Sequence, residues 1–324
     1  MPDAVLLRLR ASGWSFRPHQ PFYESFNDMS LDLHGIIPPV VTPFTEAGDI
    51  DEAAFRNVIR FNLGKNVHGL CVGGSSGEGH TLTTDELARL TTICVEEAAG
   101  AVPVVVGIIA NSTRDAIARA RAVAHLPVKA LQVTPVHYVF KPDEQATFDH
   151  FNALTSAVDI PVIIYNVVPW NYLSPALLIR LLNELPGVQG VKQSAGDLKL
   201  MADLLIGAPK DARIFTAVDA LLYPSFALGA HGTIAANPAA LPGVCVALWN
   251  AVQSGDTARA RTIHEALLRF WNTISADNLP ANIKHALTLQ GCAAGLPRAP
   301  MPRTTVAQAA NIRRELDHVL QFQA

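Results

Sequence analysis

From residue 35 onward, short apolar runs rich in β-branched residues alternate with longer stretches in which apolar positions recur at helical spacing. A capping box from Thr83 to Glu86 precedes one such stretch, residues 84–99, and another covers residues 112–124. Eight runs are predicted to be strands: residues 36–42, 69–72, 104–109, 130–134, 161–165, 188–192, 213–217 and 232–235. Eight units of a strand followed by a helix, over about 220 residues, predict an α/β protein with a closed (β/α)8 TIM barrel.

The rival architecture for such an alternation is an open, doubly wound sheet. That fold binds dinucleotides through a G-x-G-x-x-G turn after its first strand, and the sequence has no such turn there. Three further helices are predicted near residues 256–271, 280–289 and 305–320. The expected organisation is an N-terminal arm without clear periodicity over 1–33, the barrel over 34–254 and a C-terminal helical region over 255–324.

The composition and charge of the chain exclude several classes of protein. Hydrophobic residues make up 49% of the chain and charged residues 16%, so a disordered chain is excluded. The formal net charge is -3, and without a basic surplus a nucleic acid is not expected as a partner. The longest apolar run, residues 102–110, is far shorter than the ~20 residues of a membrane span, and the first residues lack the apolar core of a secretory signal. The expectation is a cytoplasmic protein that does not associate with membranes.

The four cysteines and eleven histidines follow no metal-binding or disulfide pattern. The cysteines lie far apart with no C-x-x-C pair, and no H-E-x-x-H spacing is present. Neither a metal site nor a disulfide framework is therefore expected.

Lys192 is one of only seven lysines in the chain, and it ends the sixth predicted strand. Active sites of TIM barrels lie at the C-terminal ends of the strands. By the two-residue alternation of a strand, the Lys192 side chain shares a face with Val188 and Gly190. If that face lines the barrel, desolvation favours the neutral amine, a nucleophile that forms Schiff bases with carbonyl substrates. The alternative is a strand-end lysine that simply reaches water.

Two further strand ends offer polar groups. Tyr165 ends the fifth strand, next to the sixth, so its phenol is expected near Lys192 as a proton-transfer group. The alternative is a structural aromatic ring.

The loop after strand two reads Gly73-Gly74-Ser75-Ser76-Gly77-Glu78-Gly79. Successive N–H groups in such a loop form an anion-binding nest, unless the glycines merely make a turn. Because no Lys-Ser/Thr follows the glycines, a carboxylate fits better than a nucleotide phosphate. A carboxylate nest, an amine and a phenol together suit a 2-oxo acid such as pyruvate.

The sequence resembles the dihydrodipicolinate synthase / N-acetylneuraminate lyase superfamily of class I aldolases over about residues 35–320. Gly74-Ser75-Ser76-Gly77-Glu78 resembles its G-[ST]-[ST]-G-E loop, Tyr165-Asn166-Val167 its Y-N-x strand end, and Gly190-Val191-Lys192 its G-[VI]-K strand. The resemblance implies a barrel with a C-terminal helical domain and a homotetramer built as a dimer of dimers. It also implies a small-molecule 2-oxo acid substrate and no metal or organic cofactor.

Roles for the matching residues follow from the same resemblance. Lys192 would form the Schiff base, Tyr165 would be the general acid/base, and Ser76 would link Tyr165 to a proton relay. Ser75 and Ser76, with Gly74 before them, would hold the substrate carboxylate.

The sequence departs from both branches of the superfamily. Trp170 stands near the position where the synthase branch has an arginine that binds the second substrate's carboxylate. Where the sialic acid lyase branch has an Asp-Glu pair after strand seven and a serine after strand eight, this chain has Asp219 followed by alanine, and Ala236. In place of the relay aromatic of the family's T-P-Y-Y motif, the sequence offers His137 or Tyr138.

Two functional hypotheses follow. The first is a class I lyase that makes or breaks a C–C or C–O bond beside a 2-oxo acid through a Lys192 imine. Aldol cleavage, dehydration, hydration with aldol cleavage, and condensation, including the synthase reaction itself, stay open. Trp170 nevertheless predicts a distal pocket that favours a neutral or aromatic group. The second hypothesis is a barrel that binds 2-oxo acids without catalysis. The presence of the lysine, the tyrosine and both serines together argues against it.

Overall fold

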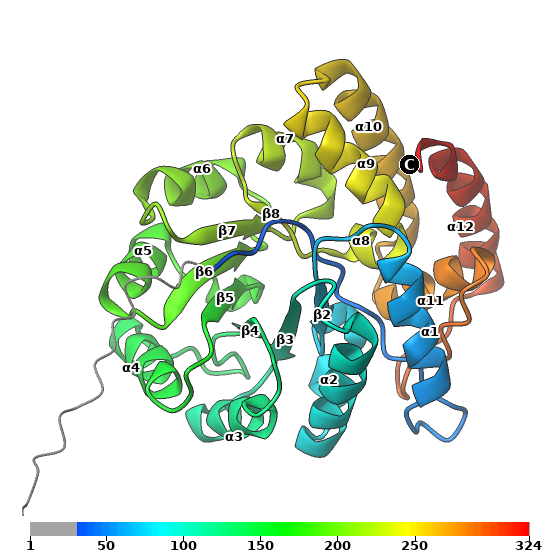
Figure 1. Cartoon of the computed structure of the whole chain (residues 1–324). Helices are drawn as coiled ribbons and strands as arrows, with labels where there is room; N and C mark the ends of the chain where they lie inside the picture. The colour runs from blue at the N-terminus through cyan, green and yellow to red at the C-terminus, as the bar shows by residue number, and fades with distance from the viewer. Residues whose placement is uncertain (1–30, 324) are drawn as a thin grey trace, which may run out of the picture.

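The computed structural model describes residues 31–323 and shows eight parallel strands surrounded by helices (Figure 1). The strands are β1 (Gly35–Ile36), β2 (Leu70–Val72), β3 (Val104–Ile108), β4 (Ala130–Val133), β5 (Val162–Asn166), β6 (Val188–Gln193), β7 (Arg213–Thr216) and β8 (Gly232–Thr233). Their order in the sheet is β1-β8-β7-β6-β5-β4-β3-β2, so β1 pairs with β8. The predicted (β/α)8 barrel is confirmed, and every strand except the first agrees with its predicted bounds to within two residues.

β1 is shorter than the predicted strand 36–42 because two prolines follow it. Pro38 and Pro39 have no N–H group to donate to a ladder. The chain nevertheless continues beside β2: the Cys71 amide donates to the Pro38 carbonyl, and the Val40 amide donates to the Cys71 carbonyl, both at 2.9 Å. These two bonds close the barrel between its first and second strands.

Helices follow the strands and form the outer layer of the barrel (Figure 1). They are α1 (Glu52–Leu63), α2 (Thr84–Ala98), α3 (Thr113–Val123), α4 (Glu144–Thr155), α5 (Pro175–Glu184), α6 (Leu198–Gly207), α7 (Leu222–Ala227), α8 (Ala236–Ala240) and α9 (Pro242–Gln253). The predicted capping box before α2 is present, since the Glu86 amide donates to Thr83 Oγ1 at 3.1 Å and the Thr83 amide donates to Glu86 Oε2 at 2.9 Å.

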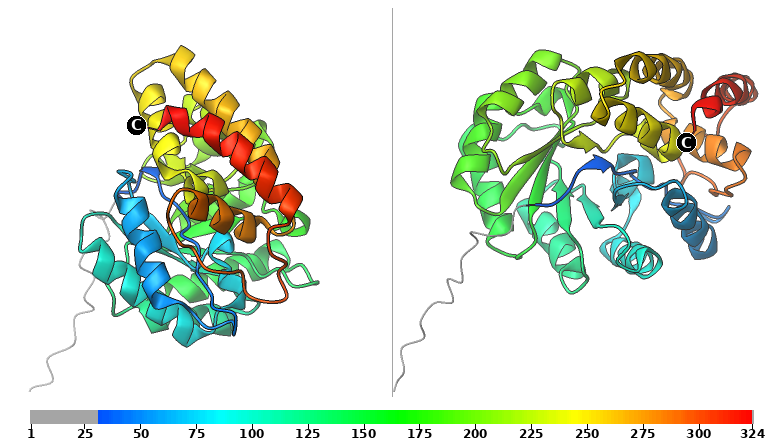
Figure 2. Two further views of the ribbon diagram at one scale, coloured as in Figure 1. Left: turned by 90° about the vertical axis from the view of Figure 1, so that its right-hand side faces the viewer. Right: turned by 45° about the horizontal axis from the view of Figure 1, so that its top comes forward.

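Three further helices, α10 (Thr257–Ile274), α11 (Leu279–Leu289) and α12 (Val306–Val319), lie to one side of the barrel (Figure 2). α10 packs against α9 and α12, and α11 packs against α8 and the short turn that follows β2. The C-terminal region therefore reaches the loops at the ends of the strands. Within residues 31–323, no helix is both long and apolar enough to cross a membrane.

One side-chain cluster fills the barrel interior. It takes a buried residue from nearly every strand, as the layered core of a TIM barrel requires; its members on the strands and their continuations are Ile37, Cys71, Val105, Ala130, Ile163, Phe215 and Ile234. Leu31 and Leu33 complete this cluster, and Arg213 Nε donates to the Leu31 carbonyl at 2.8 Å. The last residues of the predicted N-terminal arm are thus packed in the core, while the rest of the predicted arm, residues 1–30, lies outside the described residues.

Candidate active site

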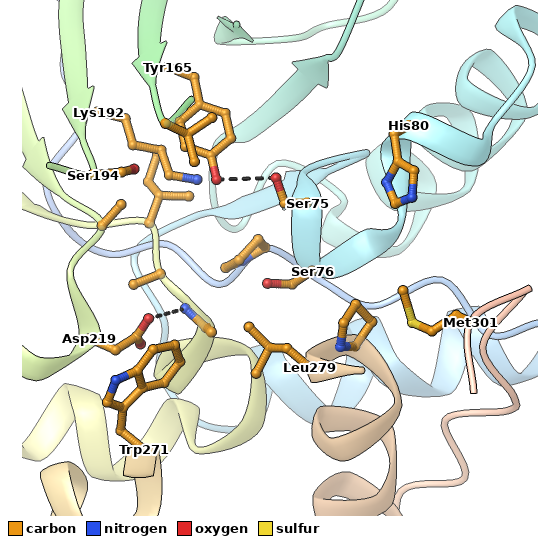
Figure 3. A pocket seen from close by; sticks show the side chains of 17 residues that line it. Ser75, Ser76, His80, Tyr165, Lys192, Ser194, Asp219, Trp271, Leu279 and Met301 are labelled. Atoms are coloured by element: carbon orange, nitrogen blue, oxygen red, sulfur yellow. Dashed lines mark hydrogen bonds between the residues drawn. The ribbon is translucent and has the colours of Figure 1, made fainter. Parts of the chain in front are cut away.

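The register of β5 and β6 places Tyr165 and Lys192 side by side. The two residues are paired across the ladder, and Lys192 is paired in turn with Phe215 of the interior cluster. Tyr165 lies two residues beyond Ile163, which also belongs to that cluster, so both side chains face the barrel interior. Lys192 is buried, and its Nζ lies 3.5 Å from the centre of the Tyr165 ring (Figure 3). The lysine does not simply reach water.

The glycines of the loop after β2 allow it to fold tightly on itself. Gly73 has a φ of +70°, and a Cβ on Gly79 would lie 1.8 Å from the Gly73 carbonyl oxygen. A short 3-10 turn, Ser75–Gly77, begins at Gly74, whose carbonyl accepts from the amides of Gly77 and Gly79. Among the described residues, the Ser75 and Ser76 amides make no hydrogen bond to another backbone group. They are the N–H groups that a nest would present to an anion.

The two serines of this turn point in different directions. Ser75 Oγ lies 3.2 Å from the Tyr165 hydroxyl, and Ser76 projects toward the centre of the pocket (Figure 3). The structure therefore puts Ser75, rather than the expected Ser76, in contact with the phenol. Consecutive residues of a turn leave the backbone at different angles, and the sequence alone does not say which of them meets Tyr165.

These groups meet in one pocket of about 350 Å³ at the C-terminal ends of the strands. It is lined by Pro39, Ser75, Ser76, His80, Tyr165, Val167, Lys192, Ser194, Ala217, Asp219, Ile234, Ala235, Ala236, Trp271, Leu279, Pro280 and Met301. A buried amine, a phenol, two hydroxyls and the free Ser75 and Ser76 amides around one pocket can bind a carboxylate and attack the carbonyl carbon beside it.

Asp219 is a buried carboxyl at the side of the pocket. Its Oδ2 accepts from the Ala236 amide at 3.2 Å, and its Oδ1 accepts from the Asn237 amide at 2.5 Å. Burial raises the pKa of Asp219 to about 6, although the two amides and the nearby Lys192 charge act in the opposite direction. Asp219 and Ala236, both predicted to bind substrate, are thus joined at the start of α8 and line the pocket.

Comparison with known proteins identifies the fold family. The sequence model of the Dihydrodipicolinate synthetase family matches residues 32–319. The chain belongs to this family. It is 33% identical over 291 residues to the 4-hydroxy-tetrahydrodipicolinate synthase of Methanopyrus kandleri, which covers 89% of this chain and 97% of that protein. It is 34% identical over 283 residues to the enzyme of the same name from Dechloromonas aromatica, which covers 86% and 94%.

A solved structure agrees with these sequence matches. The crystal structure of dihydrodipicolinate synthase from Aquifex aeolicus superposes with a TM-score of 0.83 at 26% identity, over 88% of this chain and 98% of that chain. As a member of a family whose relatives are named as synthases, the chain is an enzyme of the lyase class.

Three predicted substrate-binding residues do not line the pocket of this family member. Trp170 is 62% exposed, and its Nε1 donates to the His137 carbonyl at 2.9 Å. His137 Nδ1 lies 3.0 Å from the Pro135 carbonyl oxygen, and the Tyr138 side chain is exposed. Trp170 therefore fastens the loop after β4 to the segment after β5, outside the pocket. Gly74 also does not line the pocket, but its carbonyl holds the serine turn together.

The pocket also contains residues that the sequence reasoning missed. His80 stands at the rim, and a wall of Trp271, Leu279, Pro280 and Met301 comes from the C-terminal region. No local signal marks these residues, because the apolar ones look like ordinary members of helical faces. Only the packing of α10 and α11 over the barrel brings Trp271, Leu279 and Pro280 to the strand ends.

Proposed function

We propose that this enzyme is a class I lyase that acts on a 2-oxo acid of the pyruvate type through a Schiff base at Lys192. The observation that carries the proposal is the position of the Lys192 amine. It is buried beside the Tyr165 phenol, which is itself in contact with Ser75, and the Ser75 and Ser76 amides donate to no other backbone group. The Ser75 and Ser76 amides can bind the substrate carboxylate, and the Lys192 amine lies within the same pocket.

The chemistry follows from these positions. The Lys192 amine adds to the C2 carbonyl carbon, and the carbonyl oxygen leaves as water after it has accepted two protons. The Tyr165 ring lies against the amine, and its hydroxyl, hydrogen-bonded to Ser75, is the group that passes those protons. The protonated imine then withdraws the electron pair of a bond at C3, and an enamine forms. Addition of water to the final imine releases the product and restores the amine.

A true 4-hydroxy-tetrahydrodipicolinate synthase, the name of the curated relatives, is the alternative within this chemistry. The pocket lining speaks against it because, in the part of the chain that the structure describes, Lys192 is the one lysine or arginine among the residues around the pocket. Once the Lys192 amine is bound in an imine, the described lining has no other lysine or arginine to pair with a second carboxylate.

Borohydride trapping tests the proposal. The protein is incubated with pyruvate and borohydride, and the intact mass and the modified peptide are measured. We expect one reduced pyruvyl adduct on Lys192 and none in Lys192→Ala. Lys199→Ala serves as the matched control, because Lys199 lies on the exposed face of α6 and pairs with Asp203. Absence of an adduct with pyruvate and with a panel of other 2-oxo acids would refute the Schiff-base mechanism.

We also propose a homo-oligomer, a homotetramer as in the family that the sequence resembles. Apolar side chains are exposed on the loop after β4, where Tyr138 is 69% and Phe140 80% exposed, beside the exposed Trp170. Exposed aromatic groups of this kind are typical of subunit contacts. Sedimentation equilibrium measures the assembly, and Phe140→Ser is expected to weaken it. A monomer in the wild type would refute this proposal.

A further inference from the structure

We infer that the wall formed by Trp271, Leu279, Pro280 and Met301 is a subsite for an uncharged, ring-sized apolar group of the substrate. That group is an aromatic or compact aliphatic tail of the 2-oxo acid, or the aldehyde joined to or released from it. The inference rests on the proposed function, because it assumes that the carboxylate and carbonyl end is bound at Ser75, Ser76 and Lys192.

The position of the wall supports this assignment. Trp271 lies on α10, Leu279 and Pro280 lie at the start of α11, and Met301 lies in the loop before α12. Trp271, Leu279 and Met301 face the serine turn and the lysine across the pocket (Figure 3). A substrate whose carboxylate is held by the turn thus directs its other end toward an indole, two apolar side chains and a thioether. Indole and thioether groups gain most from burying flat or apolar partners.

The charges around the pocket exclude anionic tails. Lys192 is used by the imine, and the lining described by the structure holds no other lysine or arginine. Asp219 lies on the same side of the pocket as Trp271, where its carboxylate repels a second negative group (Figure 3). A tail carboxylate or phosphate would lose its water shell without gaining a permanent cation.

The wall also disfavours a sugar-like tail. Each hydroxyl of such a tail needs a polar partner once it is buried. Only the Trp271 Nε1–H of the wall is a strong donor, and the side chains of Leu279, Pro280 and Met301 offer no strong donor or acceptor for the remaining hydroxyls. The volume of about 350 Å³ lies near the small end of the range of about 300–1,000 Å³ for small-molecule pockets, which suits a 2-oxo acid with one ring rather than a long chain.

Trapping with matched 2-oxo acids tests this subsite without requiring turnover. Three acids are compared: pyruvate, 2-oxo-4-phenylbutanoate with a neutral aromatic tail, and 2-oxoadipate with an anionic tail. For each, the concentration that gives half-maximal borohydride adduct on Lys192 is measured. We expect the phenyl acid to reach half-saturation at a concentration at least about tenfold lower than 2-oxoadipate, the size of one aromatic contact.

Variants then locate the subsite. Trp271→Ala is expected to raise the half-saturating concentration of the phenyl acid about tenfold and to leave that of pyruvate unchanged. Met301→Ser, in a loop outside any helix, should act in the same direction, and Trp271→Phe should keep most of the preference. Asn272→Ala is the control, because Asn272 is exposed on the same helix and does not line the pocket.

The outcomes separate the two proposals. If pyruvate is trapped but the phenyl acid shows no advantage over 2-oxoadipate, or if Trp271→Ala leaves that advantage intact, the subsite assignment is wrong and the Schiff-base proposal stands. If none of the acids is trapped, the Schiff-base proposal fails and the subsite fails with it.

Discussion

Ser75 and Ser76 have the same side chain and adjacent positions, yet the turn gives them different surroundings. Ser75 Oγ lies 3.2 Å from the Tyr165 hydroxyl, whereas Ser76 is buried at the centre of the pocket. Because the sequence motif treats the two serines alike, only the fold of the turn says which hydroxyl touches the phenol.

This difference predicts unequal effects of the two alanine variants. Ser75→Ala removes the hydrogen-bond partner of Tyr165 and is expected to lower kcat about tenfold with the best substrate found, the cost of one such bond. Ser76→Ala is expected to affect KM more than kcat, since its hydroxyl faces the pocket. Tyr165→Phe should lower kcat by roughly 10²–10⁴-fold, as loss of an acid/base group does. Steady-state kinetics measures all three. A larger kcat loss in Ser76→Ala than in Ser75→Ala would restore the relay role to Ser76.

Among the elements, α11 and the loop after β2 are joined by a buried ion pair. Lys284 Nζ lies 2.5 Å from Glu78 Oε1 and 2.7 Å from the Leu296 carbonyl oxygen, and Glu78 Oε2 accepts from the Arg298 amide at 2.9 Å. Both charged side chains are buried. Glu78 directly follows the serine turn, while α11 begins with Leu279 and Pro280 of the apolar wall. The ion pair between Glu78 and Lys284 thus connects the serine turn to the helix that carries part of the apolar wall.

Removal of one partner of this pair should cost more than removal of both. Lys284→Met leaves the Glu78 carboxylate buried without its cation and is expected to lower the free energy of unfolding by about 3–5 kcal/mol. The double variant Glu78→Gln with Lys284→Met is expected to recover part of that loss, because no bare charge then remains. Urea unfolding followed by circular dichroism measures these energies, with Lys199→Ala, at an exposed pair, as a control that should change little. Equal effects of Lys284→Met and Lys199→Ala would mean that the pair is not desolvated.

At the scale of the whole molecule, the sequence predicts the barrel better than it predicts the walls of its pocket. Strand and helix positions follow from local periodicity, and Lys192 and Tyr165 are found because strand ends are where barrel chemistry lies. Trp170 was expected in the pocket and Trp271 was not, and the structure reverses the two. Both are single tryptophans beside apolar segments. Their places depend on contacts between elements far apart in the chain, which periodicity does not encode.

The largest hydrophobic cluster also spans the boundary expected at residue 254. It contains barrel residues such as Phe55 and Val244 together with Ile263, Phe270 and Leu316 of the C-terminal helices. A boundary between independent domains is crossed by few contacts, whereas a shared core makes two parts unfold together. The C-terminal region is therefore expected to be part of one cooperative unit with the barrel.

Two measurements on the full chain and one on a shortened chain check this cooperativity. Circular dichroism follows the urea unfolding of all the helices together. In a variant whose other tryptophans are replaced by phenylalanine, the fluorescence of Trp271 follows the C-terminal region. The two transitions should coincide. A chain that ends at residue 254 would expose the α9 face that packs against α10 and would leave Glu78 without Lys284. Exposed apolar surface and an unpaired buried carboxylate both disfavour folding, so this chain should be insoluble or unfolded and should form no pyruvyl adduct. A shortened chain that folds cooperatively, or a Trp271 transition separate from the loss of helix in the full chain, would instead show that the barrel and the C-terminal helices are independent domains.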